Sequence, residues 1–73
     1  MLDTLNLKAA RIKANVSVEE IAKEMGLNPV TVYRKFDGKS DFTVSELIVV
    51  KRLLHLSMTD FYSIFFGDEL AET

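Results

Sequence analysis

The 73-residue chain contains no cysteine, no tryptophan, one proline and one histidine. Without cysteine it can form no disulfide, and it has neither a thiolate nucleophile nor the ligands of a cysteine-bound zinc or iron–sulfur centre. A lone His55 cannot assemble a histidine metal site, so we expect no metal and no cofactor. No apolar run approaches the roughly 18 to 20 residues that a membrane span needs, and the first residues lack the basic and apolar regions of a secretory signal. We therefore expect a cytoplasmic protein that does not contact a membrane.

The composition that remains, 48% hydrophobic and 27% charged residues, is typical of a small globular domain. A chain of this length has room for one domain, which we place at residues 1–67, followed by a short acidic tail at residues 68–73. Residues 1–39 carry seven Lys and Arg against five Asp and Glu, whereas residues 40–73 carry two against six. This weak basic bias of the first half falls short of the strong positive field of most DNA-binding domains.

Short helices with clear end signals account for most of the chain. Ser17 and Thr43 each open a capping box, because Glu20 and Glu46 follow three residues later and can reach back to the N–H of the cap. Gly26 is the residue type best able to take the left-handed conformation that ends a helix. The predicted helices, caps included, span about Thr4–Ala14, Ser17–Met25, Asn28–Phe36, Thr43–Leu54 and Ser57–Phe66. Strand signals are poor, so the predicted fold class is all-α, a compact bundle of five short helices.

Two of these helices have a predicted core face. Leu5, Ala9, Ile12 and Val16 recur at intervals of three and four, which makes the first helix amphipathic with that face toward the core. In the fifth helix the core face is assigned to the side chains of Phe61, Ile64 and Phe65, which leaves Tyr62 or Phe66 for packing at the side or for an interface.

Residues 17–36 form the most informative unit. A capped short helix, a tight turn containing Gly26 and Asn28, and a second capped short helix describe a helix-turn-helix. In that motif the second helix lies in the major groove of DNA while the first crosses the backbone. An ordinary helical hairpin in a small bundle has the same spacing, so the spacing alone leaves both interpretations open.

A family resemblance extends over nearly the whole chain. Residues 6–11 and 19–27 resemble the start of Cro- and repressor-type helix-turn-helix proteins of temperate phages, and residues 33–43, 45–46, 60–61 and 64–66 resemble small regulators of phages of low-GC Gram-positive bacteria. The resemblance implies a lambda-repressor-like fold. The chain also resembles the modulators of repression of lactococcal temperate phages, which act against a lysogeny repressor.

The family's DNA contacts transfer unevenly to this chain. Positions that the family fills with polar DNA-contacting residues hold Val18, Pro29 and Val30 here, and Val30 could touch only a thymine methyl group. The resemblance implies a glutamate partner for Arg11 at a position that here holds Phe36, which we expect in the core. The remaining candidates for DNA contact are Asn28, Thr31, Tyr33, Arg34, Lys35 and Lys39, of which Arg34 is the best, because its guanidinium can bind guanine bidentately.

The same surface could bind a protein instead. Val18, Pro29, Val30 and Tyr33, if exposed as the family geometry implies, form an apolar strip beside the acidic Glu19 and Glu20. Together with Arg34, these residues could cover the basic recognition face of a partner repressor, with charge steering the encounter. Alternatively, Val18 and Val30 fold back into the core.

Catalysis has little support in the sequence. Asp37 and Asp41 flank Gly38-Lys39-Ser40, but this segment lacks the glycine spacing of a phosphate-binding loop and follows a helix rather than a strand. No pattern groups the Ser, His and Asp residues into a triad, so we predict no enzyme and no small-molecule substrate. We predict instead a phage regulator of the lysis–lysogeny switch that binds the helix-turn-helix domain of its cognate repressor and blocks operator binding. The alternative is a Cro-like homodimer that binds operator DNA directly.

Overall fold

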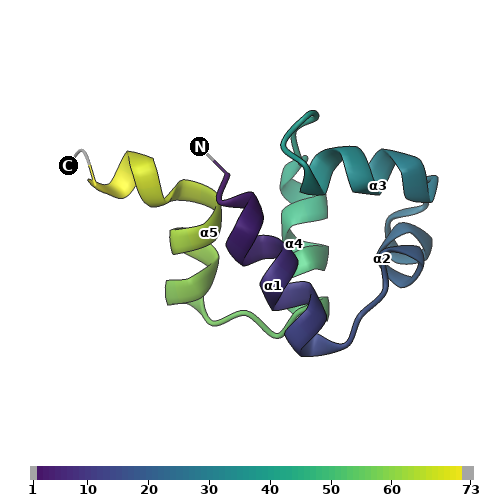
Figure 1. The fold of residues 1–73 in the computed structure, drawn as a ribbon, viewed down its shortest axis with the longest axis horizontal. Coiled ribbons are helices and arrows are strands. Elements are labelled where there is room, and N and C mark those ends of the chain that lie inside the picture. The colour runs from purple at the N-terminus through teal and green to yellow at the C-terminus, as the bar shows by residue number, and fades with distance from the viewer. Residues whose placement is uncertain (1, 72–73) are drawn as a thin grey trace.

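The computed structural model describes the backbone of residues 2–71 and the side chains of residues 2–67. Within this range the chain forms five helices and no strand: α1 (Thr4–Ala14), α2 (Val18–Met25), α3 (Pro29–Phe36), α4 (Val44–Leu53) and α5 (Met58–Ala71). The all-α prediction is therefore confirmed. Figure 1 shows α2 and α3 at one end of the molecule and α5 at the other, with α1 and α4 between them. None of the helices described is long and apolar enough to cross a membrane.

The predicted helix caps form as expected. The Oγ atom of Ser17 accepts a hydrogen bond from the Glu20 N–H at 3.0 Å, and Glu20 Oε1 accepts the Ser17 N–H at 3.3 Å. Thr43 and Glu46 make the same reciprocal pair at the start of α4. Gly26 ends α2 in the left-handed region with φ +69°, a conformation that costs glycine little because it has no Cβ.

Apolar side chains from all five helices, together with Leu54 and Leu56, form one core. Phe36 lies in it, as predicted, and its ring packs edge-on against Phe42 in the α3–α4 connection, with centroids 5.8 Å apart. Phe42 in turn packs edge-on against Phe65 of α5 at 5.5 Å. This aromatic contact joins the end of α3 to α5. The buried apolar residues are Leu7, Val18, Ile21, Ala22, Val32, Phe36, Val50, Leu54, Leu56, Ile64 and Phe65.

The predicted core face of α1 is wrong within the helix, although Val16, just after it, packs against the core as predicted. Leu5 and Ile12 are 77% and 67% exposed, whereas Leu7 is fully buried and Ala10 and Ala14 pack beside it. Both sets of residues recur at helical spacing, so periodicity alone did not distinguish them. The packing of α1 against α3 and α5 selects the Leu7 face.

The end of α5 also differs from the prediction. The helix was expected to end at about Phe66, but helical backbone continues to Ala71 beyond a kink at that residue, whose φ is −135°. Residues 68–71 of the predicted acidic tail therefore belong to α5, and residues 72 and 73 lie outside the described range. Ile64 and Phe65 are buried, Phe61 and Phe66 are partly buried, and Tyr62 is 45% exposed.

Candidate recognition surface

A three-residue turn sets α3 against α2. Gly26, Leu27 and Asn28 connect the two helices, and the Leu27 N–H donates to the Ala22 carbonyl at 2.9 Å. The Oδ1 atom of Asn28 accepts the Val30 N–H at 2.9 Å and so caps α3, with Pro29 at its first position. The turn is short and hydrogen-bonded at both helix ends, which holds α3 in a defined position relative to α2.

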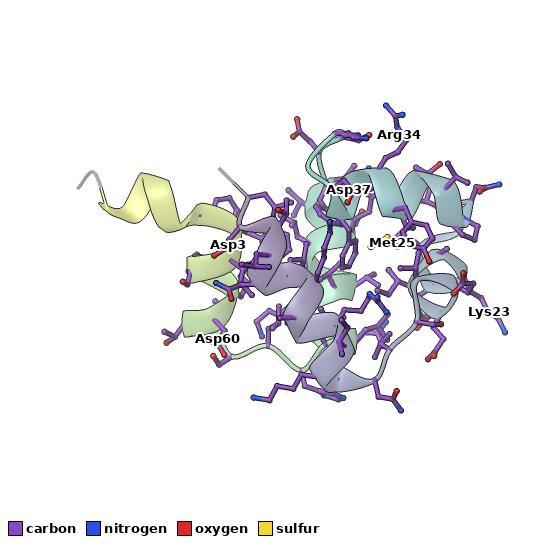
Figure 2. The ribbon with its side chains drawn as sticks, viewed as in Figure 1. Asp3, Lys23, Met25, Arg34, Asp37 and Asp60 are labelled. Carbon is purple, nitrogen blue, oxygen red and sulfur yellow. The ribbon has the colours of Figure 1, made fainter. Side chains whose placement is uncertain are left out.

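The outer face of α3 contains four exposed residues at helical spacing. Val30, Tyr33, Arg34 and Asp37 recur at intervals of three and four residues and therefore share one side of the helix. Val30 is 66% exposed and Tyr33 49% exposed. Figure 2 shows the Arg34 side chain extending away from α3 into solvent. This face presents a guanidinium, an aromatic ring and an aliphatic side chain to any partner that approaches it.

The surroundings of this face add smaller polar groups. Glu19 and Lys39 are exposed, Asn28 is exposed at the start of α3, and Thr31 and Pro29 are partly buried. Glu20 is exposed too, but its carboxylate accepts hydrogen bonds from the Ser17 N–H and hydroxyl.

Val18 does not belong to this surface. We expected it in an exposed apolar strip, but it is 2% exposed and lies in the core with Ile21 and Ala22. Val18 is the first residue of α2, and the helix turns the face that contains it toward α3 and α4. The exposed apolar strip is thus reduced to Val30 and Tyr33, with Pro29 at its edge.

The prediction for Lys35 is also wrong. We expected it to contact phosphate, but its side chain is only 10% exposed and points into the protein. The Nζ atom donates to the Asp41 carbonyl at 2.7 Å, lies 2.9 Å from Glu46 Oε1, and is 5.9 Å from the centre of the Phe42 ring. Lys35 therefore anchors α3 to the start of α4 and is removed from any DNA contact.

Two cations of α1, Lys8 and Arg11, make contacts that no local sequence signal indicated. Lys8 lies 2.7 Å from Asp37 at the end of α3, and its ammonium lowers the pKa of the Asp37 carboxyl. Arg11, which the resemblance left without a partner, donates from Nη1 to the Val16 carbonyl at 2.9 Å. The Lys8 contact spans twenty-nine positions in the chain, so only the folded structure reveals it.

The charge of the surface is balanced. Residues 17–39 carry four Lys and Arg and four Asp and Glu. Of the four cations Lys35 is buried, which leaves Lys23, Arg34 and Lys39 exposed. Because non-specific DNA affinity rises with the number of phosphates neutralised, this surface offers little of it.

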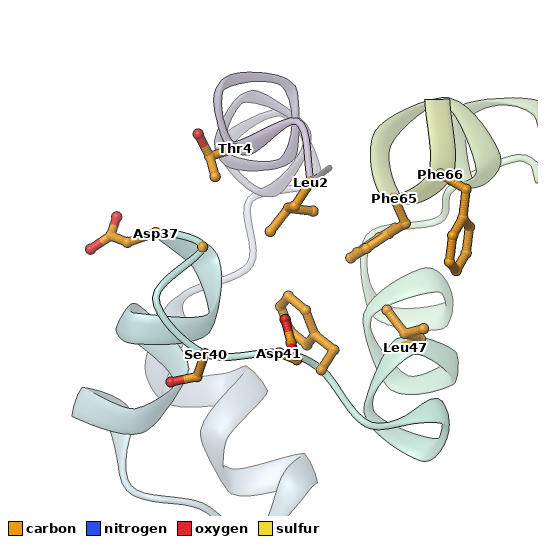
Figure 3. A pocket seen from close by; sticks show the side chains of 10 residues that line it. Leu2, Thr4, Asp37, Ser40, Asp41, Leu47, Phe65 and Phe66 are labelled. Atoms are coloured by element: carbon orange, nitrogen blue, oxygen red, sulfur yellow. The ribbon is translucent and has the colours of Figure 1, made fainter. Parts of the chain in front are cut away.

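A separate open cavity of about 750 Å³ lies between the start of α1, the α3–α4 connection and α5. Figure 3 shows Leu2 and Phe65 facing into it across from Asp37 and Ser40. No group of three or more His, Asp or Glu side chains that could hold a metal ion occurs among the side chains described. Of the exposed α3 face the cavity includes Asp37, but not Val30, Tyr33 or Arg34.

Comparison with known protein families finds a similarity in the helix-turn-helix region. A model for bacterial regulatory proteins of the tetR family matches residues 13–44, which run from the end of α1 through α2 and α3 to the first residue of α4. The α2–α3 unit is a helix-turn-helix that is similar to those of bacterial regulatory proteins. No curated protein and no solved structure matches the chain. The match covers 32 of the 73 residues and coincides with the helix-turn-helix, so it bears on this unit rather than on the rest of the chain.

Proposed function

We propose that this chain is a transcription regulator that binds operator DNA through its helix-turn-helix, with α3 as the recognition helix. The observation that supports this most directly is the exposed Arg34 on the outer face of α3, in a unit similar to those of bacterial regulatory proteins. The guanidinium can donate two hydrogen bonds to the O6 and N7 atoms of guanine. Tyr33 lies one position before it, and Lys39 adds a cation for phosphate.

The proposal also states where the regulator acts. The resemblance to small phage regulators supports a role at the operator of a lysis–lysogeny switch, inside the cytoplasm of a bacterial host. The proposed activity is binding alone, without catalysis, cofactor or small-molecule substrate.

A second candidate function is modulation of repression, in which the same face of α3 binds the helix-turn-helix domain of a cognate phage repressor. Two observations favour it. Val30, in the first turn of α3, is strongly exposed, and its side chain can neither donate nor accept a hydrogen bond. Glu19, exposed at the start of α2, repels phosphate but attracts the basic recognition face of a repressor.

The experiment that tests the proposal starts with selection of duplexes from a random-sequence DNA pool at low salt, followed by fluorescence-anisotropy titration of the enriched duplex. We expect Arg34→Ala to weaken binding by about 1 to 3 kcal/mol, because it removes a bidentate base contact. The matched control is Lys13→Ala, an exposed cation on α1 that lies outside the helix-turn-helix, which should bind as the wild type does.

The outcome separates the two candidates. With Arg34 bound to a base, Lys23 and Lys39 are the exposed cations left for phosphate, so the logarithm of the binding constant should fall with the logarithm of the salt concentration with a slope of about −2 per chain. If no duplex is enriched, or if Arg34→Ala binds as well as Lys13→Ala, direct DNA recognition by α3 is wrong. The second candidate is then tested by titrating the cognate repressor against wild type and Val30→Asp, and intact binding by Val30→Asp would exclude the α3 face there too.

A further inference from the structure

The outer side of α4 has an exposed apolar surface that the helix-turn-helix does not use. Val44 and Ile48 are one turn apart and are 75% and 61% exposed, whereas Val50, on the opposite side of the helix, is fully buried. Large aliphatic side chains this exposed on a soluble helix often mark a contact site when they occur together.

The α5 helix has an exposed apolar pair of its own. Met58 and Tyr62 are 51% and 45% exposed, again one turn apart. Leu47 of α4 and Phe66 of α5 line the same cavity, and the Tyr62 ring lies 6.2 Å from that of Phe66. Exposed apolar side chains are therefore present on α5 as well as on α4.

The charges around α4 indicate what covers it. Asp41 is exposed just before the helix and Lys51 lies in its last turn, whereas Glu46 is already paired with Lys35 and Arg52 with Glu24. An antiparallel copy of α4 centred on Ile48 would bring the basic end of each helix beside the acidic end of the other. The opposed helix dipoles favour the same arrangement.

We propose that a second copy of this chain docks on α4, so that the two α4 helices pack antiparallel about a two-fold axis near Ile48. Such an interface is self-complementary and closes after two copies. Val44 and Ile48 of the two chains form its apolar centre, with the charged ends of the helices at its rim. This inference does not depend on whether α3 binds DNA or a repressor, since no residue of the α3 face takes part.

Sedimentation equilibrium of the full chain without DNA tests the proposal. We expect the mass to rise from 8.3 kDa toward twice that value as the concentration increases up to about 500 µM. Ile48→Lys should weaken dimerisation by at least about tenfold, because it places two ammonium groups at the two-fold axis. Ile12→Lys, on the exposed side of α1 and 67% exposed in the wild type, is the matched control and should dimerise normally.

A charge exchange tests the antiparallel arrangement. Lys51→Glu alone and Asp41→Lys alone should each dimerise less, because each places like charges at both ends of the interface. An equal mixture of the two variants should form a heterodimer, since acidic then faces basic at both ends. The proposal is overturned if the wild type stays at 8.3 kDa throughout, if Ile48→Lys and Ile12→Lys behave alike, or if the mixture associates no better than its components.

Discussion

At the scale of single residues, Lys35 shows how a charge can be structural within a recognition helix. Its ammonium is enclosed by the Asp41 carbonyl, the Glu46 carboxylate and the face of the Phe42 ring. A buried cation is tolerated only where such partners replace its hydration. The contact fixes the C-terminal end of α3 to the start of α4, and thereby the direction in which Arg34 points.

We predict that Lys35→Met lowers the free energy of unfolding by about 1 to 3 kcal/mol, because Glu46 loses its charged partner in a setting with little water. Urea denaturation followed by circular dichroism measures the change. The double variant Lys35→Met, Glu46→Gln should regain part of the loss, since the amide keeps the capping hydrogen bond and carries no charge.

The exposed ion pair between Lys8 and Asp37 provides the comparison. Both side chains are more than 40% exposed, and pairs of this kind contribute little to stability. Lys8→Met should therefore change the urea midpoint much less than Lys35→Met. Equal losses for the two variants would mean that the enclosure of Lys35 has no energetic consequence.

At the scale of helices, α2 depends on its ends. Eight residues are too few for a helix that is stable in isolation, so the capping box at Ser17 and Glu20 and the left-handed Gly26 contribute to its formation beyond the burial of Ile21. These signals are local in the sequence, and they explain why the bounds of α2, α3 and α4 could be predicted to within a residue.

Ser17→Ala should destabilise the protein by about 1 kcal/mol, because the N–H of Glu20 loses its acceptor. In a domain of this size that corresponds to a fall in Tm of roughly 4 to 8 °C, measurable by thermal denaturation. Ser63→Ala, at an exposed position in the middle of α5, serves as the control and should leave Tm unchanged or slightly higher, since alanine favours helix. A control variant that loses as much as Ser17→Ala would refute the capping explanation.

At the scale of the whole molecule, three carboxyl groups have a pKa below the usual range, and two of them, Asp37 and Glu46, contact a residue of another helix. Hydrogen bonds from the Asn6 N–H and side chain lower the pKa of Asp3, and Lys8 lowers that of Asp37. Partial burial alone raises the pKa of Glu46, but hydrogen bonds from the Thr43 N–H and the Lys35 ammonium outweigh it and lower the pKa.

A carboxyl group with a lowered pKa in the folded protein stabilises the fold above its unfolded pKa and loses that contribution as the pH falls. We therefore expect stability to be constant at neutral pH and to decline below about pH 4.5, where the unfolded carboxyls bind protons that the folded ones resist. Urea midpoints between neutral and acidic pH measure this decline. Glu46→Gln removes one of the three groups and should give a shallower decline, and an unchanged slope would exclude Glu46 as a contributor.

The bounds of α2 and α3 and the turn between them followed from the sequence because caps, turns and glycine conformations involve residues only two to four positions apart. Helical spacing places Val30, Tyr33 and Arg34 on one side of α3, but the sequence left open whether Val30 folds back into the core, and the structure exposes it. The core positions of Phe36, Ile64 and Phe65 were also predicted and confirmed.

The tertiary structure alone decided which of two apolar stripes of α1 is buried, that Val18 enters the core, and that Lys35 turns inward while Arg34 stays exposed. Each of these outcomes depends on contacts between helices that are distant in the chain. Leu5 and Leu7 have the same hydrophobicity, and only the positions of α3 and α5 determine which of them loses contact with water. Helix formation is local, whereas burial is a property of the assembled bundle.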